Sequence, residues 1–260
     1  MAEACAAGWV LLLIAPFIGS FLGLVIRRLP DGLPIAFARS VCEECGVRLK
    51  TRDLVPVLSW LAQKGRCRYC GHRLDWFYPG VELAALAVAL SAILVDGGPG
   101  GGQTGDDGAW LDCLLGWWLL TLGWIDLRRG LLPDVLTLPL VLAGLAAAGV
   151  FEPVELTQRA LGAALGYTSL VVVAAVYRKL RGREGLGRGD AKLLAASGAW
   201  VGAAALPQII LLAALVALLA AAGLRLAGVR LGAHSALPFG PFLALATWVL
   251  WLSGPLGAIG

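Results

Sequence analysis

The stretch WLDCLLGWWLLTLGWIDLRR, residues 110–129, decides how this chain folds. Its apolar part is as long as a helix that crosses the hydrocarbon core of a bilayer, which takes about 20 residues. The apolar run ends at Asp126, just before Arg128 and Arg129. A carboxylate at membrane depth is costly and usually has a functional role. The stretch therefore predicts a transmembrane helix that carries a functional acid at one end.

The composition of the whole chain is that of an integral membrane protein. Of its 260 residues, 59% are hydrophobic and 15% are charged, and the mean hydropathy is +0.81. A soluble domain of this length could not hide so much apolar surface, because its exterior must meet water. We expect an all-α polytopic protein of the lipid bilayer, with no nucleic-acid partner. The apolar runs predict about eight transmembrane helices, at roughly 8–27, 80–96, 110–127, 131–149, 157–179, 190–203, 205–227 and 237–255.

The Lys and Arg residues indicate how these helices are oriented. Connections rich in basic residues alternate with connections that have almost none, and of 21 basic residues only Arg159 falls on the opposite side. Basic connections of membrane proteins stay in the cytoplasm. The pattern predicts that the N- and C-termini lie outside and that the 30–79 loop is cytoplasmic. Asp126 and Asp190 are then both expected at the cytoplasmic membrane face.

The 30–79 loop contains two Cys-x2-Cys pairs, Cys42/Cys45 and Cys67/Cys70, which are separated by 21 residues. This spacing resembles a four-cysteine zinc ribbon, in which four thiolates form a closed, structural metal site. Disulfides are the alternative, but a cytoplasmic loop lies in a reducing compartment, which favours zinc. We expect three regions: a first transmembrane helix over 1–29, a small cytoplasmic zinc-ribbon-like loop domain over 30–79, and a transmembrane domain over 80–260.

A second acid in the apolar part of the chain is Asp190, which closes Gly187-Arg188-Gly189-Asp190 and opens the next apolar run. Two carboxylates held close together cannot both ionise, so such a pair shares one proton. The ionised partner can take a proton from a water while the neutral partner donates one to a scissile peptide carbonyl. Gly187 and Gly189 lack Cβ atoms and would let backbone approach a substrate closely. We therefore expect residues 80–260 to form an aspartic peptidase domain, although Asp190 alone would also suit a helix N-terminus.

Three other acids have less specific expected roles. Asp134, in Pro133-Asp134, is expected to support the N-terminus of the fourth apolar helix. Glu82 is expected either to pair with a basic side chain or to assist a second site. Asp112 is expected to be solvated near the outer membrane face.

Several short motifs occur in one order along the chain, and the order is more specific than any single motif. They are Gly19-Ser20-Phe21-Leu22, Arg28-Leu29-Pro30, the two cysteine pairs, Tyr78-Pro79, Val81-Glu82, Ile125-Asp126-Leu127, Gly187-x-Gly189-Asp190 and Leu237-Pro238-Phe239-Gly240-Pro241-Phe242. In this order, from about residue 16 to 245, the chain resembles the type IV prepilin peptidases. These are membrane aspartic proteases of the GxGD type that are both leader peptidases and N-methyltransferases.

The resemblance implies a site, a substrate and a location. Asp126 and Asp190 would be the catalytic pair, and Cys42, Cys45, Cys67 and Cys70 the metal ligands. The substrates would be prepilins or pseudopilins with basic leader peptides, cut after a glycine at the bacterial inner membrane. S-adenosylmethionine would then supply a methyl group to the new N-terminus. Pilus assembly and type II secretion fit equally. The sequence has Gly23 where the family commonly has Asn, and Gly80 where Leu is usual.

Two other functions stay open on the sequence alone. One is an intramembrane aspartyl protease without methyltransferase activity, which would not need the cysteine loop. The other is a non-catalytic membrane scaffold with a zinc ribbon, which would give no reason for two acids at one membrane face.

Overall fold

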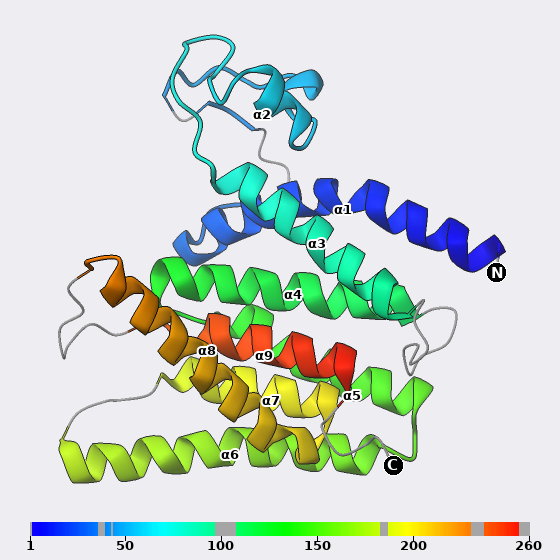
Figure 1. The fold of residues 1–260 in the computed structure, drawn as a ribbon, viewed down its shortest axis with the longest axis vertical. Coiled ribbons are helices and arrows are strands. Elements are labelled where there is room, and N and C mark those ends of the chain that lie inside the picture. The colour runs from blue at the N-terminus through cyan, green and yellow to red at the C-terminus, as the bar shows by residue number, and fades with distance from the viewer. Residues whose placement is uncertain are drawn as a thin grey trace. The chain divides into compact units, whose positions relative to one another are not determined.

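The structure is a computed structural model that describes residues 2–35, 40–42, 44–96, 108–182, 187–229 and 237–254, without the side chains of 2–7 and 96. Over these residues it consists of helices, with two isolated β-bridges and no named strand. The α-helices are α1 Ala2–Arg28, α2 Leu58–Ala62, α3 Phe77–Asp96, α4 Gly108–Arg129, α5 Asp134–Phe151, α6 Leu156–Arg181, α7 Arg188–Val201, α8 Leu206–Leu226 and α9 Gly240–Ser253 (Figure 1). Short 3-10 turns are η1 Leu29–Asp31, η2 Thr51–Asp53 and η4 Ala203–Ala205.

The all-α membrane fold expected from the sequence is confirmed, and every predicted apolar segment contains a helix. Six of the described helices are long and apolar enough to cross a bilayer: α1, α3, α4, α5, α6 and α8. The helices α7 and α9 have only 14 residues each, which is shorter than a typical span. The number of spans is therefore at least six by this measure, and the predicted count of eight stays a prediction.

The chain forms two compact units, Met1–Trp117 and Trp118–Gly260. In the first unit, α1 and α3 pack side by side and the cysteine loop connects them (Figure 1). The two helices approach closely at Gly19, where an added Cβ would lie 2.6 Å from the Cα of Glu82. The sequence analysis treated the 30–79 loop as a region separate from the helices. In the structure, the loop contacts α1 and α3 and belongs to the same compact unit.

In the second unit, the short helix α7 packs against α5, α6 and α9, and α8 packs against α9. Ten of the 14 residues of α7 are buried. The buried Ser197 is bonded inside the unit: its hydroxyl lies 2.6 Å from the Thr247 hydroxyl of α9. A helix that neighbours enclose in this way does not need the apolar surface of a lipid-facing span.

Glycines allow α6 and α7 to pack backbone against backbone. An added Cβ on Gly198 would lie 2.2 Å from the carbonyl oxygen of Gly162, and one on Gly166 would lie 2.5 Å from that of Leu194. Gly162 and Gly166 are four residues apart on α6, the small-xxx-small spacing that brings membrane helices together. This contact positions α7, and hence Asp190 in its first turn.

We expect Gly198→Ala to destabilise the protein by about 1–3 kcal/mol or more, because backbone atoms on both helices must move to admit a methyl group. Thermal unfolding of the purified protein in detergent would measure the loss. The matched control is Gly149→Ala in α5, where an added Cβ meets nothing within 4 Å. Alanine should be neutral or slightly stabilising there, since it is the better helix former. Equal melting temperatures for the two variants would contradict this packing argument.

Two charged residues have environments that the sequence did not indicate. Arg159 is buried in α6, where its guanidinium donates to the Trp200 carbonyl at the end of α7 and to the Glu152 carboxylate. It therefore caps α7, which explains by packing why this one basic residue breaks the alternation of charge. Asp112 is 4% exposed, so the expectation that it is solvated is wrong. More than half of the apolar window of α4 is buried, and Asp112 lies within that helix.

Candidate active site and metal site

Asp126 lies near the end of α4 and is 6% exposed. Its Oδ2 accepts a hydrogen bond from the backbone N–H of Gly240, at 2.9 Å. Gly240 begins α9, 114 residues further along the chain. An added Cβ on Gly240 would lie 2.6 Å from the same oxygen, so only glycine lets this amide come so close. Gly240 therefore belongs to the candidate site, although the sequence analysis gave it no role.

Asp190 lies in the first turn of α7 and is 8% exposed. Its backbone N–H donates to the Gly187 carbonyl at 3.2 Å, which closes the turn before the helix. The carboxylates of Asp126 and Asp190 lie near enough to repel each other when both are charged. The second unit thus contains two buried acids that are 64 residues apart in the sequence, and their role as a catalytic pair stays a prediction.

The two glycines before Asp190 provide space rather than unusual backbone. Gly187 has a φ of −71°, which any residue can adopt. An added Cβ on Gly187 would lie 3.2 Å from the Asp190 Oδ2, and one on Gly189 would lie 2.9 Å from the Cβ of Leu132. Leu132 belongs to the connection between α4 and α5. Gly187 therefore leaves room for the Asp190 carboxylate, and Gly189 lets this connection pack closely against the start of α7.

Asp134 is the first residue of α5, as expected, and it also forms an ion pair with Lys192 of α7. Lys192 lies two residues after Asp190, so the pair connects the N-terminal ends of α5 and α7. Its Asp134 side chain is 57% exposed, and an exposed ion pair contributes about 0–1 kcal/mol. Asp134 is therefore an exposed residue that links two helix ends, and it does not belong with the two buried acids.

The cysteine loop contains two small hairpins of the same design, over residues 40–49 and 65–74. In the first, the Cys42 N–H donates to the Val47 carbonyl, and in the second the Cys67 N–H donates to the His72 carbonyl. The glycine after each pair, Gly46 or Gly71, has a positive φ and donates its N–H back to the first cysteine of the pair. Positive φ is why glycine stands at both positions.

The four sulfurs of Cys42, Cys45, Cys67 and Cys70 lie within 4.8 Å of one another, and those of Cys42 and Cys70 are 3.9 Å apart. A tetrahedral site with Zn–S bonds of about 2.3 Å has sulfurs about 3.8 Å apart, so the cluster fits such an ion. Hydrogen bonds from the backbone amides of Cys45 and Glu44 lower the pKa of Cys42 to about 7, which makes a thiolate available. His72 lies outside this cluster and is 3.7 Å from Glu44.

Glu82 of α3 connects the cysteine loop to the helices of the first unit. Its Oε2 accepts the backbone N–H of Val57 at 2.7 Å, and Ser20 of α1 is a second hydrogen-bond partner. Among the described contacts, these two hydrogen bonds take the place of the basic partner that the sequence led us to expect for Glu82.

Val57 lies in a tight turn: its φ is 59°, and the Leu58 N–H donates to the Pro56 carbonyl at 2.5 Å. A γ-turn of this hand is rare and strained for a β-branched residue, so surrounding contacts must hold it.

Two family models match the chain, Bacterial Peptidase A24 N-terminal domain over residues 13–95 and Type IV leader peptidase family over residues 113–222. The first match contains the four cysteines and the second contains both aspartates, whereas Gly240 lies beyond it. No solved structure matches the chain.

Curated relatives are similar over most of the chain. A prepilin leader peptidase/N-methyltransferase from Burkholderia pseudomallei (strain K96243) is 40% identical, over 87% of this chain and 79% of its own length. Proteins of the same name from Dickeya chrysanthemi and Aeromonas hydrophila are 40% and 38% identical, over 91% and 93% of this chain and 89% of their own lengths. With relatives this similar over most of both chains, and with both family models matched, the chain belongs to the type IV leader peptidase family.

Proposed function

We propose that this protein removes the leader peptides of prepilins or pseudopilins and then N-methylates the new N-terminal residue. The observation that carries the peptidase proposal is the buried pair of Asp126 and Asp190, which lies inside the Type IV leader peptidase match. The names of the relatives support both activities. Basic leader peptides and cleavage after glycine come from the family resemblance.

In the proposed cleavage, Asp126 and Asp190 share one proton. The ionised carboxylate takes a proton from a water, and the water oxygen attacks the scissile carbonyl carbon, whose oxygen receives the proton of the neutral carboxyl. The tetrahedral intermediate then expels the amine, which leaves with a proton, and the pair returns to one proton. The Gly240 amide holds the Asp126 carboxylate in place. The close packing of Leu132 against Gly189 holds the start of α7, which carries Asp190.

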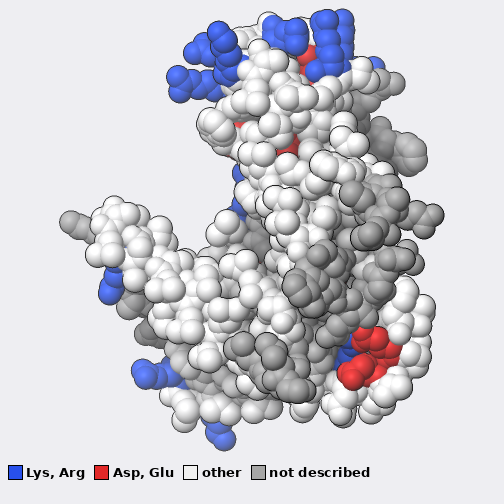
Figure 2. Space-filling model, turned by 45° about the vertical axis from the view of Figure 1, so that its right-hand side comes forward, with Lys and Arg blue, Asp and Glu red and all other residues white. Residues whose placement is uncertain are grey.

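We propose that the active site lies at the cytoplasmic face of the bacterial inner membrane and that both termini lie outside. The helices α1, α4, α6 and α8 have basic residues in their last turns, whereas α3 and α5 have none. Seven Lys and Arg side chains of the cysteine loop are exposed, and Figure 2 shows blue side chains gathered over that loop at the top of the view. Basic ends and loops stay in the cytoplasm. This orientation places the end of α4 and the starts of α7 and α9 on the cytoplasmic side.

We propose that Cys42, Cys45, Cys67 and Cys70 bind one zinc ion. Four thiolates leave no position open for a substrate, so the ion would hold the loop in its fold. S-adenosylmethionine would be the methyl donor for the second activity, as a co-substrate.

One experiment tests the two activities together. The purified protein is reconstituted in membranes with a prepilin and S-adenosylmethionine, and the N-terminus of the product is read by mass spectrometry. We expect a shortened, singly methylated product. An intact substrate would refute the peptidase proposal. A shortened but unmethylated product would leave a peptidase alone.

We expect the protein purified without chelators to contain about one zinc per chain, measured by elemental analysis. Cys67→Ser should lower the zinc content and loosen the loop, because the ligand set is then incomplete. Cys113→Ser is the matched control, since Cys113 is buried in α4 and lies outside the cysteine cluster. A wild-type protein without zinc or another thiophilic metal would contradict the metal site.

We expect Glu82→Ala to impair methylation more than cleavage, because the loop then loses its acceptor for the Val57 amide. Losing a hydrogen bond to a charged acceptor costs about 1.5–3 kcal/mol, so the loop should open about tenfold more often. Trypsin should then cut faster at Lys64 and Arg66, which are exposed in the loop. Glu82→Gln retains an acceptor oxygen and is the control. Wild-type trypsin sensitivity in Glu82→Ala would contradict the role of the Glu82–Val57 hydrogen bond in holding the loop.

A further inference from the structure

Asp53 is a buried carboxylate between the two cysteine hairpins, and the peptidase chemistry does not use it. Its side chain is 1% exposed, although most charged residues of the loop face solvent. A buried carboxylate is costly unless hydrogen-bond donors satisfy its oxygens. The burial of Asp53 therefore indicates a structural role for this side chain.

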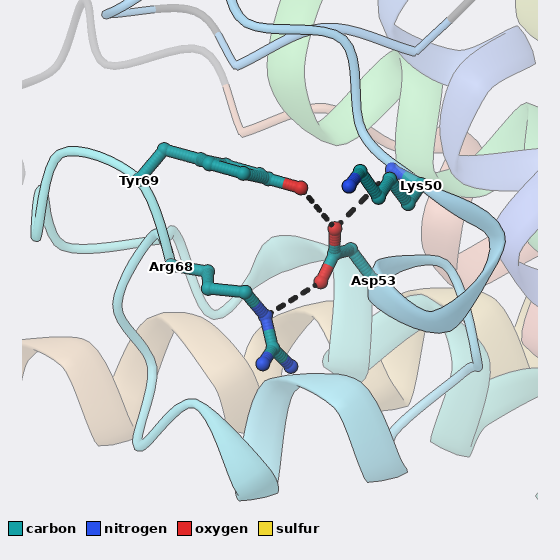
Figure 3. A network of polar contacts seen from close by, with 4 residues as sticks. All are labelled: Lys50, Asp53, Arg68 and Tyr69. Carbon is teal, nitrogen blue, oxygen red and sulfur yellow. Dashed lines mark hydrogen bonds and ion pairs between the residues drawn. The ribbon is translucent and has the colours of Figure 1, made fainter.

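Three donors satisfy the Asp53 carboxylate (Figure 3). Oδ1 accepts from Arg68 Nε at 2.9 Å. Oδ2 accepts from the Tyr69 hydroxyl at 3.0 Å and from the backbone N–H of Lys50 at 3.2 Å. Burial alone would raise the pKa of Asp53, but these three donors lower it below its usual value, so the group is a carboxylate at neutral pH.

The positions of these donors relate Asp53 to the thiols. Arg68 and Tyr69 are the two residues between Cys67 and Cys70, and both bind the same carboxylate. Lys50 comes directly after the first hairpin, whose last backbone hydrogen bond runs from Leu49 to Ser40. A single side chain therefore fastens the tip of the second hairpin to the chain leaving the first. The link uses no sulfur and therefore does not depend on a metal ion.

We infer that Asp53 is a positioning residue for the four-thiolate site: it holds Cys67 and Cys70 in register with Cys42 and Cys45 before the metal binds. A site held in this way loses less conformational freedom on binding than two hairpins that move independently. This inference rests on the metal site proposed above. Partners that orient metal ligands typically affect metal affinity by about 10–100-fold, and we expect an effect of that size here.

The test uses the full-length protein in detergent and measures metal binding rather than activity. Zn²⁺ affinity is obtained by competition with a chromophoric chelator, and the rate of Zn²⁺ release is followed after excess chelator is added. We expect Asp53→Asn to bind Zn²⁺ about 10–100-fold more weakly and to release it faster. With saturating Co²⁺, its thiolate absorption should match the wild type, because all four ligands are present.

Two further variants keep the inference testable if Asp53→Asn does not fold. Tyr69→Phe removes one hydrogen bond and retains the Arg68 ion pair, so it should weaken Zn²⁺ binding by less than Asp53→Asn. Asp75→Asn is the matched control, because Asp75 is a carboxylate of the same loop that binds Arg27 outside the hairpins. It should bind Zn²⁺ like the wild type.

The outcomes separate this inference from the proposed metal site. A wild-type protein that takes up no Zn²⁺ or Co²⁺ would overturn both. Wild-type affinity and release rate in Asp53→Asn would overturn the role of Asp53 and leave the site intact. If only Tyr69→Phe can be purified, affinity and release equal to those of Asp75→Asn would overturn it as well. A changed Co²⁺ spectrum in Asp53→Asn would also overturn it, since the residue would then determine which ligands bind.

Discussion

Asp126→Asn and Asp190→Asn should each abolish leader cleavage, with a loss of about 10⁴-fold or more in kcat. The proposed mechanism needs a carboxylate and a carboxylic acid side by side, and an amide can replace neither in proton transfer. Both side chains are buried, and asparagine has nearly the same size and retains an acceptor oxygen, which the Gly240 amide can still bind at Asp126. The variants should therefore insert in the membrane normally. Cleavage is measured on a reconstituted prepilin by gel shift and mass spectrometry.

Two controls accompany this result. Asp134→Asn should lose far less activity, because Asp134 is exposed and its ion pair with Lys192 is worth little. Asp126→Asn should still methylate a substrate that is supplied already cleaved, since transfer of a methyl group to an amine needs neither carboxylate. Full cleavage by either single variant would remove that aspartate from the catalytic pair.

The sequence was sufficient for the features that depend on local pattern. Apolar runs located the six long apolar helices of the described residues, because in a bilayer a helix must satisfy its own backbone and therefore forms a continuous run. The spacing of the cysteines predicted the cluster of four sulfurs, and the structure confirms it. The two acids stood out because charge is rare in such runs. Their catalytic role stays a prediction until the variants are tested.

The features that the sequence did not reveal depend on contacts between distant segments. In the sequence, Asp53 is one more charged residue of a basic loop. Only the structure shows that it binds Arg68 and Tyr69. The enclosure of α7 by neighbouring helices was not predicted, because a helix enclosed by other helices reads as apolar in sequence, like a lipid-facing one. Arg159 appeared as an exception to the charge pattern, and only its contact with the end of α7 explains it. Burial and pairing of this kind follow from tertiary packing and leave no periodic signal.

Gly240→Ala should reduce cleavage by about 10²-fold without unfolding the protein. An added methyl group would lie 2.6 Å from the Asp126 Oδ2 and 3.0 Å from its Cγ. The carboxylate would have to turn away and give up the 2.9 Å hydrogen bond from the Gly240 amide. A displacement of about 1 Å at a catalytic group can cost about 10² in rate. Initial rates of prepilin cleavage measure the loss.

The matched control for Gly240→Ala is Gly123→Ala, on the α4 side of the same helix contact. An added Cβ on Gly123 would lie 3.4 Å from the Pro241 Cα and 3.6 Å from the Ala244 Cβ, which is close to ordinary van der Waals contact. Gly123 is one turn before Asp126, so its substitution tests the α4–α9 contact without touching the carboxylate. We expect its cleavage rate to stay within about threefold of the wild type, since an added methyl group there fits without forcing its neighbours apart. If Gly240→Ala were as active as Gly123→Ala, the Gly240 amide would have no part in holding Asp126, and the carboxylate would have to be positioned by α4 alone.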